Sequence, residues 1–204
     1  MEPKKHRYHH GDLRAALLKA AEQELKARGI EQFSLRGVAR AAGVSHAAPA
    51  HHFGDVTGLL TALAVVGWHR FVEAQRRQQA KAEAEPLAQL VAAAKGYAAF
   101  AKANPELFVL MFASQKADRC DPAFQTAGDA AFDHLLGLVN TVAGRDADAH
   151  PDTMIDALAT WSLIHGIASL LNNGFLLALG GGKAERDAAI TAMITRYWRA
   201  QPAV

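Results

Sequence analysis

Apolar residues recur at helical spacing along most of this chain. In the first such segment, Leu13, Leu17, Ala21 and Leu25 follow one another every four residues and therefore share one face of a helix. Gly29 comes next and suits the left-handed cap of a helix end, so we predict a first helix over residues 10–28. β-branched residues are scattered, without regular alternation between turn signals. The pattern predicts an all-α fold.

Two short helices are predicted next. Ser34 is placed to cap the first of them, which Gly43 and Val44 then break. The residues expected on its inner side are Leu35, Val38, Ala39 and Ala42. Ser45 is expected to cap a third helix. Two short helices joined by a tight turn with glycine are typical of a helix-turn-helix, whose second helix enters the major groove of DNA, although helical proteins of many kinds contain such turns.

The rest of the chain is also predicted to be helical. The expected ranges are residues 56 to about 85, 87–103, 106–115, 122–143 and 152–179, followed by a last helix with Ile190, Met193, Ile194, Tyr197 and Trp198 on one face. We predict two domains, 1–55 and 56–204, joined through the helix that starts at residue 56 rather than through a flexible linker.

The charges are unevenly distributed, although the formal net charge is only +2. Residues 1–55 carry nine Lys and Arg against six Asp and Glu, together with six of the ten histidines. Charge alone leaves open both an ordinary mixed surface and a nucleic-acid footprint.

Cysteine usage and the N-terminal residues favour a cytoplasmic protein. Cys120 is the single cysteine and cannot form an internal disulfide. The first seven residues are charged and lead into no apolar run, which argues against a signal peptide. Residues 154–179 are apolar enough to suggest a membrane span, but Asp156, His165 and Asn172 would have to lose water there. We therefore expect no membrane partner.

The longest motif is residues 33–45 (FSLRGVARAAGVS), followed by His52 and Phe53. This run resembles the helix-turn-helix of the TetR family of transcriptional regulators. Residues 7–14 (RYHHGDLR) and 161–166 (WSLIHG) resemble the TetR subgroup with a Trp-His-Gly C-terminal domain. The resemblance implies an N-terminal three-helix DNA-binding domain, a C-terminal helical domain for ligand binding and dimerisation, and a repressor rather than an enzyme.

Double-stranded DNA is the partner expected for the N-terminal domain. We expect Arg36 and Arg40 to contact phosphates. The residues expected closest to the bases are Ser45, His46, Ala47, Ala48 and His51, and a basic arm of Lys4, Lys5 and Arg7 is expected to reach the minor groove. This set lacks the bidentate Arg and Asn contacts that discriminate bases best, so DNA shape is expected to contribute to selectivity.

The motif departs from the family pattern at three positions. Ala50 stands where the family usually has a tyrosine that contacts the DNA backbone, and Val56 replaces a basic residue. Pro49 lies early in the third helix, where a missing N–H costs less than in the interior. We expect weaker, salt-sensitive DNA binding as a result.

A small, largely apolar effector is expected in the C-terminal core. Trp161 and His165 lie four residues apart and share a helix side. They either form a wall and a polar anchor of the effector pocket or have a purely structural role. Further candidates for the pocket are Phe100, Phe108, Met111 and Phe112. No cofactor is expected.

A homodimer is expected, because the helix that begins at residue 152 is apolar on nearly every side. The resemblance implies a four-helix bundle made by the last two helices and their symmetry mates. The candidates for this interface are Ile167, Leu170, Leu171, Ile190, Ile194 and Tyr197. Two-fold symmetry predicts a roughly palindromic operator.

Other functions receive less support. Histidines 6, 9, 10, 46, 51 and 52 suggest a metal site, but no cysteine or carboxylate pattern completes it. Cys120 lies beside one arginine and two acids, which favours a bystander over a redox switch. No phosphate-binding loop and no nucleophile-base grouping is found. The rival hypothesis is a helical ligand- or metal-sensing protein with weakened or lost DNA binding, supported by Ala50 and Val56.

Overall fold

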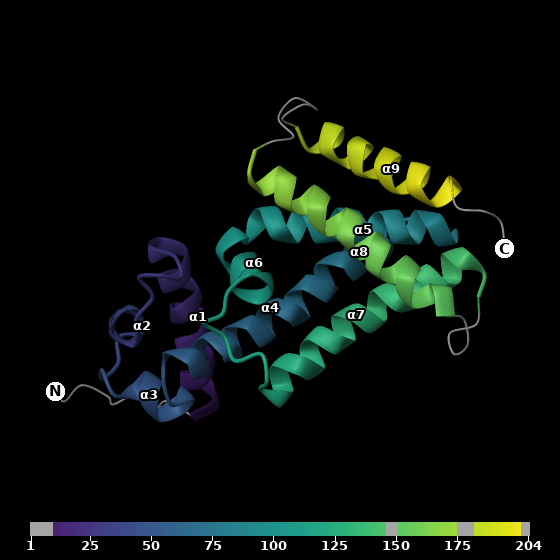
Figure 1. Cartoon of the computed structure of the whole chain (residues 1–204). Helices are drawn as coiled ribbons and strands as arrows, with labels where there is room; N and C mark the ends of the chain where they lie inside the picture. The colour runs from purple at the N-terminus through teal and green to yellow at the C-terminus, as the bar shows by residue number, and fades with distance from the viewer. Residues whose placement is uncertain (1–9, 146–150, 175–181, 201–204) are drawn as a thin grey trace. The chain divides into compact units, whose positions relative to one another are not determined.

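The computed structural model describes residues 10–145, 151–174 and 182–200, and within them it contains nine helices and no strand (Figure 1). The helices are α1 (His10–Arg28), α2 (Leu35–Ala42), α3 (Ala48–Phe53), α4 (Val56–Gln79), α5 (Pro86–Ala103), α6 (Pro105–Phe112), α7 (Pro122–Ala143), α8 (Pro151–Asn172) and α9 (Lys183–Arg199). The all-α prediction is confirmed. Residues 175–179, expected to extend the eighth helix, lie outside the described residues.

The chain divides into two compact units. The first comprises the described residues up to Gly67 together with Glu106–Gln125, and the second comprises Trp68–Pro105 and the described residues from Thr126 onward. Helix α4 thus supplies residues to both units, and α6 belongs to the first. The domain division at residues 55 and 56 stays a prediction.

The start of the first unit follows the sequence signals. The Ser34 hydroxyl accepts a hydrogen bond from the backbone N–H of Gly37 at 3.1 Å, which makes Ser34 the N-cap of α2. Gly43 ends this helix with φ at +67°, a conformation that favours glycine. The next backbone N–H, that of Val44, bonds to the Ala39 carbonyl at 3.0 Å. The tight turn between α2 and α3 is therefore set by one capped helix end.

Apolar side chains of α1, α2 and α4 fill the core of the first unit. Leu17, Ala21, Val38 and Ala39 have no exposed surface, and α1 packs against α2. The α4 residues Leu59, Leu60, Leu63 and Ala64 are at most 1% exposed. The predicted inward position of Val38 and Ala39 is confirmed, whereas Leu35 and Ala42 are only half-buried.

Helix α6 and the loop after it are tied to α1 and α4 within the first unit. A Cβ placed on Gly67 of α4 would lie 2.6 Å from the Met111 sulfur, so α6 packs directly on this glycine. In the loop, Lys116 Nζ donates to the Ile30 carbonyl at 3.2 Å and pairs with Glu31 at 2.8 Å. The backbone N–H of Asp118 donates to Thr61 Oγ1 at 2.8 Å.

Three helices end earlier than predicted. Helix α8 ends at Asn172 rather than at residue 179, and Gly174 after it has φ at +74°. Helix α4 stops at Gln79 instead of continuing to about residue 85, and the Gln79 carbonyl accepts a hydrogen bond from the Gln89 side chain at 3.2 Å. Farther on, Pro86 disfavours a helical backbone at Glu85. Glu85 has an extended backbone instead, and its carboxylate accepts the N–H groups of Leu87 and Ala88 at the start of α5. Helix α6 stops at Phe112, whose carbonyl accepts a hydrogen bond from the Arg119 guanidinium.

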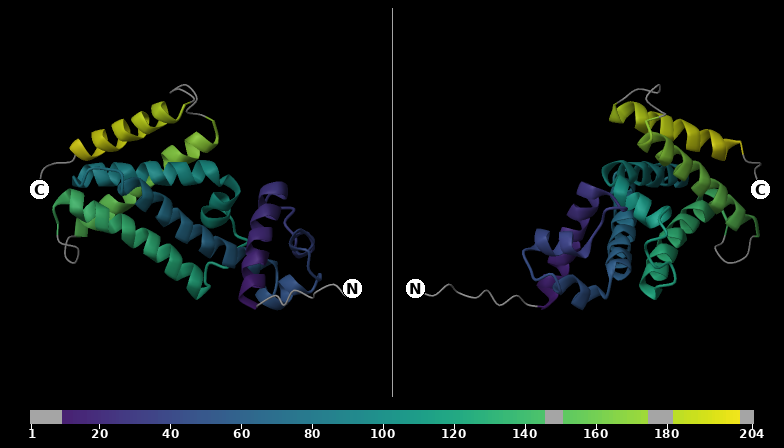
Figure 2. Two further views of the ribbon diagram at one scale, coloured as in Figure 1. Left: turned by 180° about the vertical axis from the view of Figure 1, so that it is seen from behind. Right: turned by 60° about the vertical axis from the view of Figure 1, so that its left-hand side comes forward.

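The second unit is built around α5. Helix α5 packs against α8 and α9, and α9 also lies beside α8 in every view (Figures 1 and 2). On the side of α4, a Cβ added to Gly96 of α5 would lie 2.5 Å from the Gln75 Cα and 2.6 Å from the Ala74 carbonyl oxygen. The two helix backbones therefore approach each other as closely as a glycine allows.

Helix α8 has enough length and apolar character to cross a membrane, with 28% of its most apolar window buried. Its polar side chains nevertheless take part in packing within the second unit. Asp156 pairs with Arg145 at 2.6 Å, and Asn172 donates to the Ala101 carbonyl of α5 at 3.1 Å. These contacts favour a packed helix over a membrane span, where such groups would be costly.

Replacing Gly96 by alanine is expected to lower the free energy of unfolding by about 1–3 kcal/mol, because the added methyl group meets backbone atoms that cannot rotate away. Urea denaturation followed by circular dichroism measures the change. Gly137→Ala is the matched control, since Gly137 is an exposed helical position with nothing within 4 Å of an added Cβ. The control is expected to gain up to about 1 kcal/mol. Equal stability of the two variants would contradict the close approach of α4 and α5.

Candidate nucleic-acid interface and the interior of the second unit

Helix α3 is six residues long and begins later than its sequence indicates. Its N-cap is Ala47, which has no side chain to accept a hydrogen bond, so the prediction that Ser45 caps this helix is wrong. The Ser45 carbonyl instead accepts the Ala48 N–H at 3.0 Å, which forms a turn ahead of the helix. Pro49 lies in the first turn, where its missing N–H would have no helical partner.

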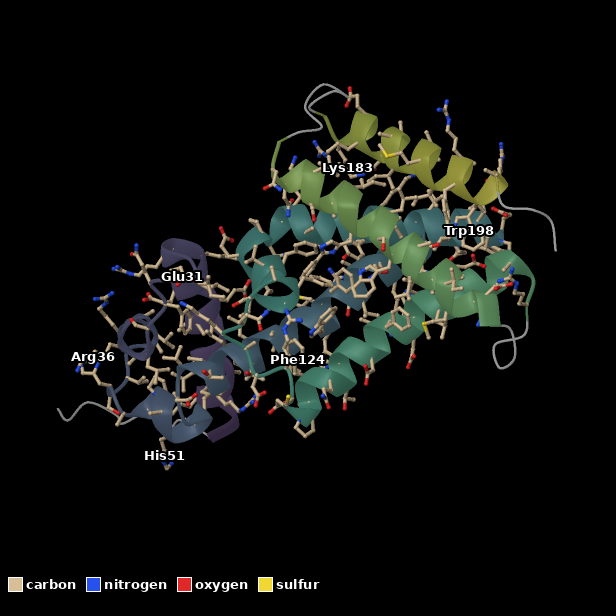
Figure 3. The ribbon with its side chains drawn as sticks, viewed as in Figure 1. Glu31, Arg36, His51, Phe124, Lys183 and Trp198 are labelled. Atoms are coloured by element: carbon tan, nitrogen blue, oxygen red, sulfur yellow. The ribbon has the colours of Figure 1, made fainter. Side chains whose placement is uncertain are left out.

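The side chains predicted to bind DNA lie on the surface of the first unit. Arg36 and Arg40 of α2 are exposed, as are Ser45, His46, Ala47 and His51 around α3, while Ala48 is half-buried. Arg36 and His51 point outward from the two helices (Figure 3). The structure thus brings the α2 arginines and the α3 histidine to one solvent-exposed helix-turn-helix. Lys4, Lys5 and Arg7 lie outside the described residues.

One basic residue near α3 was missed by the sequence analysis. The guanidinium of Arg14 on α1 lies over the Phe53 ring at 5.0 Å from its centroid. A cation over an aromatic ring is held in place by the ring's negative face. Arg14 is exposed and adds positive charge beside the C-terminal end of α3. Its contact with Phe53 could not be found from sequence, because the two residues are 39 positions apart.

The described residues contain no group of three or more His, Cys, Asp or Glu that could hold a metal ion. The rings of His51 and His52 lie 5.7 Å apart, edge to face. His6 and His9 lie outside the described residues, as does the side chain of His10. Cys120 is exposed.

A hydrogen-bonded aromatic cluster connects α5 and α8 inside the second unit. The Tyr97 hydroxyl on α5 lies 2.7 Å from His165 Nδ1 and 3.4 Å from Trp161 Nε1, both on α8. Tyr97 is 4% exposed, and its ring contacts Phe71 at a centroid distance of 4.6 Å. Trp161 and His165 therefore share one hydrogen-bonding partner, the hydroxyl of Tyr97.

Burial favours the neutral forms of both titratable side chains in this cluster. The Trp161 N–H can only donate, so it occupies one lone pair of the Tyr97 oxygen. Burial raises the pKa of Tyr97, which keeps the phenol protonated, and burial lowers the pKa of His165, which favours neutral imidazole. An arrangement in which the Tyr97 hydroxyl donates to His165 Nδ1, with the histidine proton on Nε2, gives the Trp161 N–H and the Tyr97 O–H one acceptor each.

The candidate effector residues are divided between the two units. Phe108, Met111 and Phe112 lie on α6 in the first unit, where the rings of Phe108 and Phe112 are tilted by 47° with their centroids 4.7 Å apart. Phe100, Trp161 and His165 lie in the second unit, and the Phe71 ring, which contacts Tyr97, also contacts Phe100 at 5.5 Å. Sequence analysis missed Tyr97, the residue that joins Trp161 to His165.

Three of the predicted interface residues belong to the core. Ile167, Ile190 and Ile194 are 5%, 2% and 0% exposed within the single chain, so they offer a partner almost no surface. The helical spacing of these three residues therefore marked the buried faces of α8 and α9, not the faces open to a partner. Leu171 and Tyr197 are half-buried, and only Leu170 is exposed.

Exposed apolar side chains concentrate on a different part of α8. Of the five large hydrophobic residues exposed in the described part of the chain, four lie on this helix: Met154, Ile155, Leu158 and Leu170. Met154, Ile155 and Leu158 are 47%, 64% and 44% exposed. Their spacing in sequence was the available signal, since Leu158 follows Met154 by four residues and Ile155 by three and is therefore a neighbour of both on the helix surface.

Two family models match the sequence. Residues 17–63 match the model described as bacterial regulatory proteins, tetR family, and residues 90–197 match the tetracyclin repressor-like C-terminal domain. The chain belongs to the TetR family. The second match is consistent with the Trp-His-Gly subgroup, which stays a prediction.

Solved structures support this assignment. A Rhodococcus sp. RHA1 protein of unknown function is 38% identical, with a TM-score of 0.79 over 96% of this chain and 98% of that one. A TetR-like regulator from the same organism is 19% identical (TM-score 0.67; 96% and 100% covered). LfrR from Mycobacterium smegmatis, solved with proflavine, is 18% identical (TM-score 0.62; 90% and 95% covered). No curated protein sequence matches.

Membership in the TetR family identifies the exposed helix-turn-helix as a DNA-binding element. The protein is a DNA-binding transcriptional regulator, and the family and its structural relatives are regulators rather than enzymes. The predicted family and class of function are confirmed.

The His165 imidazole is expected to make the TetR-family protein less stable in mild acid. Its folded pKa lies below the usual 6.5, so below pH 6.5 the unfolded chain takes up a proton that the folded chain does not, and stability falls until the pH passes the folded pKa. Urea denaturation from about pH 7.5 to about pH 5 measures this slope. His165→Asn cannot titrate but keeps an acceptor for the Tyr97 hydroxyl, and it is expected to flatten the slope.

The remaining slope in that variant is expected from His134, whose pKa is also lowered, first by burial and then by Arg76. His69→Asn, which removes an exposed histidine of α4, is the control. An unchanged pH dependence in His165→Asn would contradict the neutral, Tyr97-bonded imidazole.

Proposed function

We propose that this protein is a homodimeric repressor that binds a roughly palindromic operator and is released by a small, largely apolar effector. The observation that supports DNA recognition most directly is the exposed set of side chains on α2 and around α3. Arg36 and Arg40 supply charge for phosphates, while His46 and His51 supply hydrogen-bonding groups for base edges. As a DNA-binding regulator it acts in the cytoplasm, where bacterial DNA lies.

The chemistry of α3 favours selectivity through DNA shape. Residues 48–53 contain no Arg, Lys, Asn or Gln, the side chains that make the strongest bidentate base contacts. Ala47 and Ala48 are small enough to contact thymine methyl groups. Lys4, Lys5 and Arg7 precede α1 and complete the proposal as a minor-groove arm, where groove width attracts basic side chains.

The second copy in the proposed dimer covers the exposed apolar side of α8. Met154, Ile155 and Leu158 form one patch near the start of the helix, and Leu170 lies near its end. An apolar surface of this kind on a helix is typical of a protein interface. Half-buried Leu171 and Tyr197 remain candidates for its edge. In the proposed dimer, contact with the partner subunit would bury these exposed apolar side chains.

The effector is proposed to act on the interior of the C-terminal half. The candidate residues Phe100, Trp161 and His165 of the second unit combine a largely apolar surface with one polar ring. The candidates Phe108, Met111 and Phe112 belong to the first unit and are proposed separately as effector contacts on α6. The complex of the relative LfrR with proflavine, an aromatic molecule, supports an aromatic-lined pocket. To release DNA, the effector must bind the free dimer more tightly than the operator-bound dimer.

A second function remains in view because of Ala50 and Val56. Both residues are half-buried and apolar, so neither supplies the phosphate contact that the family pattern has at its position. A ligand- or metal-sensing protein with weakened or lost DNA binding would fit these two substitutions. The measurement of DNA binding separates the two functions.

The protein is expected to bind one fragment from the region around its own gene more tightly than an unrelated fragment. Fluorescence anisotropy over a salt series measures the affinity for each fragment. Arg36→Ala is expected to weaken binding to all fragments and to reduce the salt slope by roughly 0.9 for each phosphate contact removed. His51→Ala is expected to reduce the preference for the specific fragment.

Lys102→Ala is the control for this measurement, because it removes one exposed positive charge from α5 in the second unit. Equal, weak binding to every fragment, unaffected by Arg36→Ala, would contradict the repressor and favour the sensor that has lost DNA binding.

The double variant Ile155→Lys with Leu158→Lys is expected to be monomeric, because two charges would be buried in the proposed interface. Analytical ultracentrifugation measures the mass in solution. Val109→Lys is the matched control, since Val109 is as exposed as Leu158, at 44%, but lies on α6. A dimer that survives the double variant and dissociates with Val109→Lys would place the interface elsewhere.

A further inference from the structure

A groove of about 320 Å³ lies between α5 and α9, and all of its lining residues belong to the second unit. Its volume is near the lower end of the range of about 300–1,000 Å³ that small-molecule sites occupy. No residue of the predicted DNA-binding set, of the Tyr97 cluster or of the exposed apolar patch of α8 lines this groove. Its side chains are therefore available for a separate function.

The groove is lined by residues at helical spacing on two antiparallel helices. On α9 these are Thr191, Thr195 and Arg199, which follow one another every four residues, and on α5 they extend from Leu87 to Lys95. Helix α5 runs toward α6, whereas α9 runs in the opposite direction (Figure 1). Lys95 and Arg199 are therefore attached at opposite ends of the groove, and Thr195 lies between them along its length.

The two cationic residues of the groove, Lys95 and Arg199, have no ion pair or hydrogen-bond partner for their side chains among the described residues. Lys95 is half-buried and Arg199 is exposed. Helical side chains are tilted toward the N-terminus of their own helix. Because α5 and α9 are antiparallel, this tilt directs both cations toward the middle of the groove. Two cations that converge in this way repel each other, and an anion between them relieves the repulsion.

One hydroxyl near the middle of the groove is free to donate a hydrogen bond. Thr195 is half-buried, and its side chain makes no hydrogen bond to the part of the chain that the structure describes. Thr191 differs, because its hydroxyl already donates to the Asp187 carbonyl at 2.7 Å. An anion between the two cations therefore has the Thr195 hydroxyl as a third donor.

The acidic residue of the lining, Glu85, is already engaged. Its carboxylate accepts the N–H groups of Leu87 and Ala88 at 3.1 and 2.7 Å, and the positive end of the α5 dipole offsets its charge. Glu85 precedes α5 and so lies at the end of the groove away from Lys95. The positive charge in the middle of the groove therefore remains in excess.

The floor of the groove is aliphatic. Val91 and Ala92 are 7% and 5% exposed. The half-buried side chains of Leu87 and Ala88 continue this surface toward the start of α5. Among the described residues, no aromatic ring belongs to the lining. The helix rises by about 6 Å from Val91 to Leu87, which is room for a short hydrocarbon chain.

We propose that this groove binds a small aliphatic carboxylate. The carboxylate group lies between Lys95 and Arg199 and accepts a hydrogen bond from the Thr195 hydroxyl. The hydrocarbon chain lies on Val91 and Ala88 and points toward the start of α5. Hydrogen bonds between charged groups are roughly twice as strong as neutral ones, so the carboxylate fixes the orientation of the ligand. This binding is independent of the operator and of the effector proposed for the interior.

Nuclear magnetic resonance of the full chain with hexanoate tests the site, because backbone amide shifts report where the probe binds. The amides of Ala92 and Thr195 are expected to shift to saturation. Hexylammonium has a similar chain and the opposite charge, and it is expected to leave both amides unchanged. Acetate keeps the carboxylate without the chain and is expected to bind more than about tenfold more weakly. The measurement contains no DNA, so a failed repressor hypothesis and a failed groove hypothesis are distinguishable.

Three substitutions test the proposed contacts with the carboxylate. Lys95→Met removes the charge of a half-buried side chain and is expected to raise the dissociation constant about tenfold. Arg199→Gln is expected to raise it about fivefold, because solvent screens the exposed guanidinium. Thr195→Val removes the hydroxyl at nearly constant size and is also expected to raise it about fivefold.

Matched controls separate a built site from general attraction to basic helices. Lys102→Met on α5 and Arg196→Gln on α9 remove exposed charges that do not line the groove. Both are expected to leave the dissociation constant within about twofold of the unaltered protein. Ala88→Leu fills the groove without changing its charge and is expected to weaken binding. Unchanged amide shifts far from the groove show that each variant keeps its fold.

Three results would overturn the proposal. The first is equal binding of hexanoate and hexylammonium, which would mean that the charges play no part. The second is the same loss of affinity with Arg196→Gln as with Arg199→Gln. The third is a shift of the Ala92 and Thr195 amides with protein concentration in the absence of any probe, which would mean that a second copy of the chain occupies the groove.

Discussion

The structure depends on one helix, α4, that contributes buried side chains to the cores of both units. In the first half of α4, Leu59, Leu60 and Leu63 fill the core of the first unit, and in its second half Phe71 and Gln75 are buried in the core of the second. The α4 backbone can be buried this closely only because α5 has a glycine where the two helices meet. One continuous set of helical hydrogen bonds therefore takes part in both cores, and a change in the packing of α4 in either core acts on the same backbone.

Much of this fold could be predicted because its signals are local. Residues 10–28 and 122–143 have the predicted bounds. The Ser34 hydroxyl caps the start of α2, and Gly43 ends it in a left-handed conformation. Local signals also compete, and there the sequence prediction failed. Ser45 is a good capping residue, yet the turn after Gly43 uses its carbonyl and delays α3 to Ala48. The helical pattern continued past Gln79, but α4 ends there, and Pro86 then favours the extended backbone seen at Glu85.

Contacts between distant residues could not be predicted from one sequence. Trp161 and His165 were recognisable as a pair from their spacing. Nothing in that spacing identified Tyr97, which lies 64 residues before Trp161 and accepts a hydrogen bond from its indole N–H. For a related reason, the sequence prediction assigned Ile167, on the buried face of α8, to the dimer interface. The helix is apolar on several sides, so periodicity could not tell Ile167, which is buried, from Ile155, which is exposed. Only the packing of α5 and α9 against α8 makes that distinction.

The chemistry of the DNA-binding surface makes dimerisation important for selectivity. Arg36 and Arg40 add affinity that is independent of sequence, because every DNA site has phosphates. His46 and His51 add base contacts, but each half-site has few of them and no bidentate arginine or asparagine. In the proposed dimer, two such half-sites bind at a fixed separation, so the second binds at a high effective concentration and the modest preferences of both are combined. The apolar patch of α8, far along the chain from α3, then contributes to selectivity as directly as the histidines do.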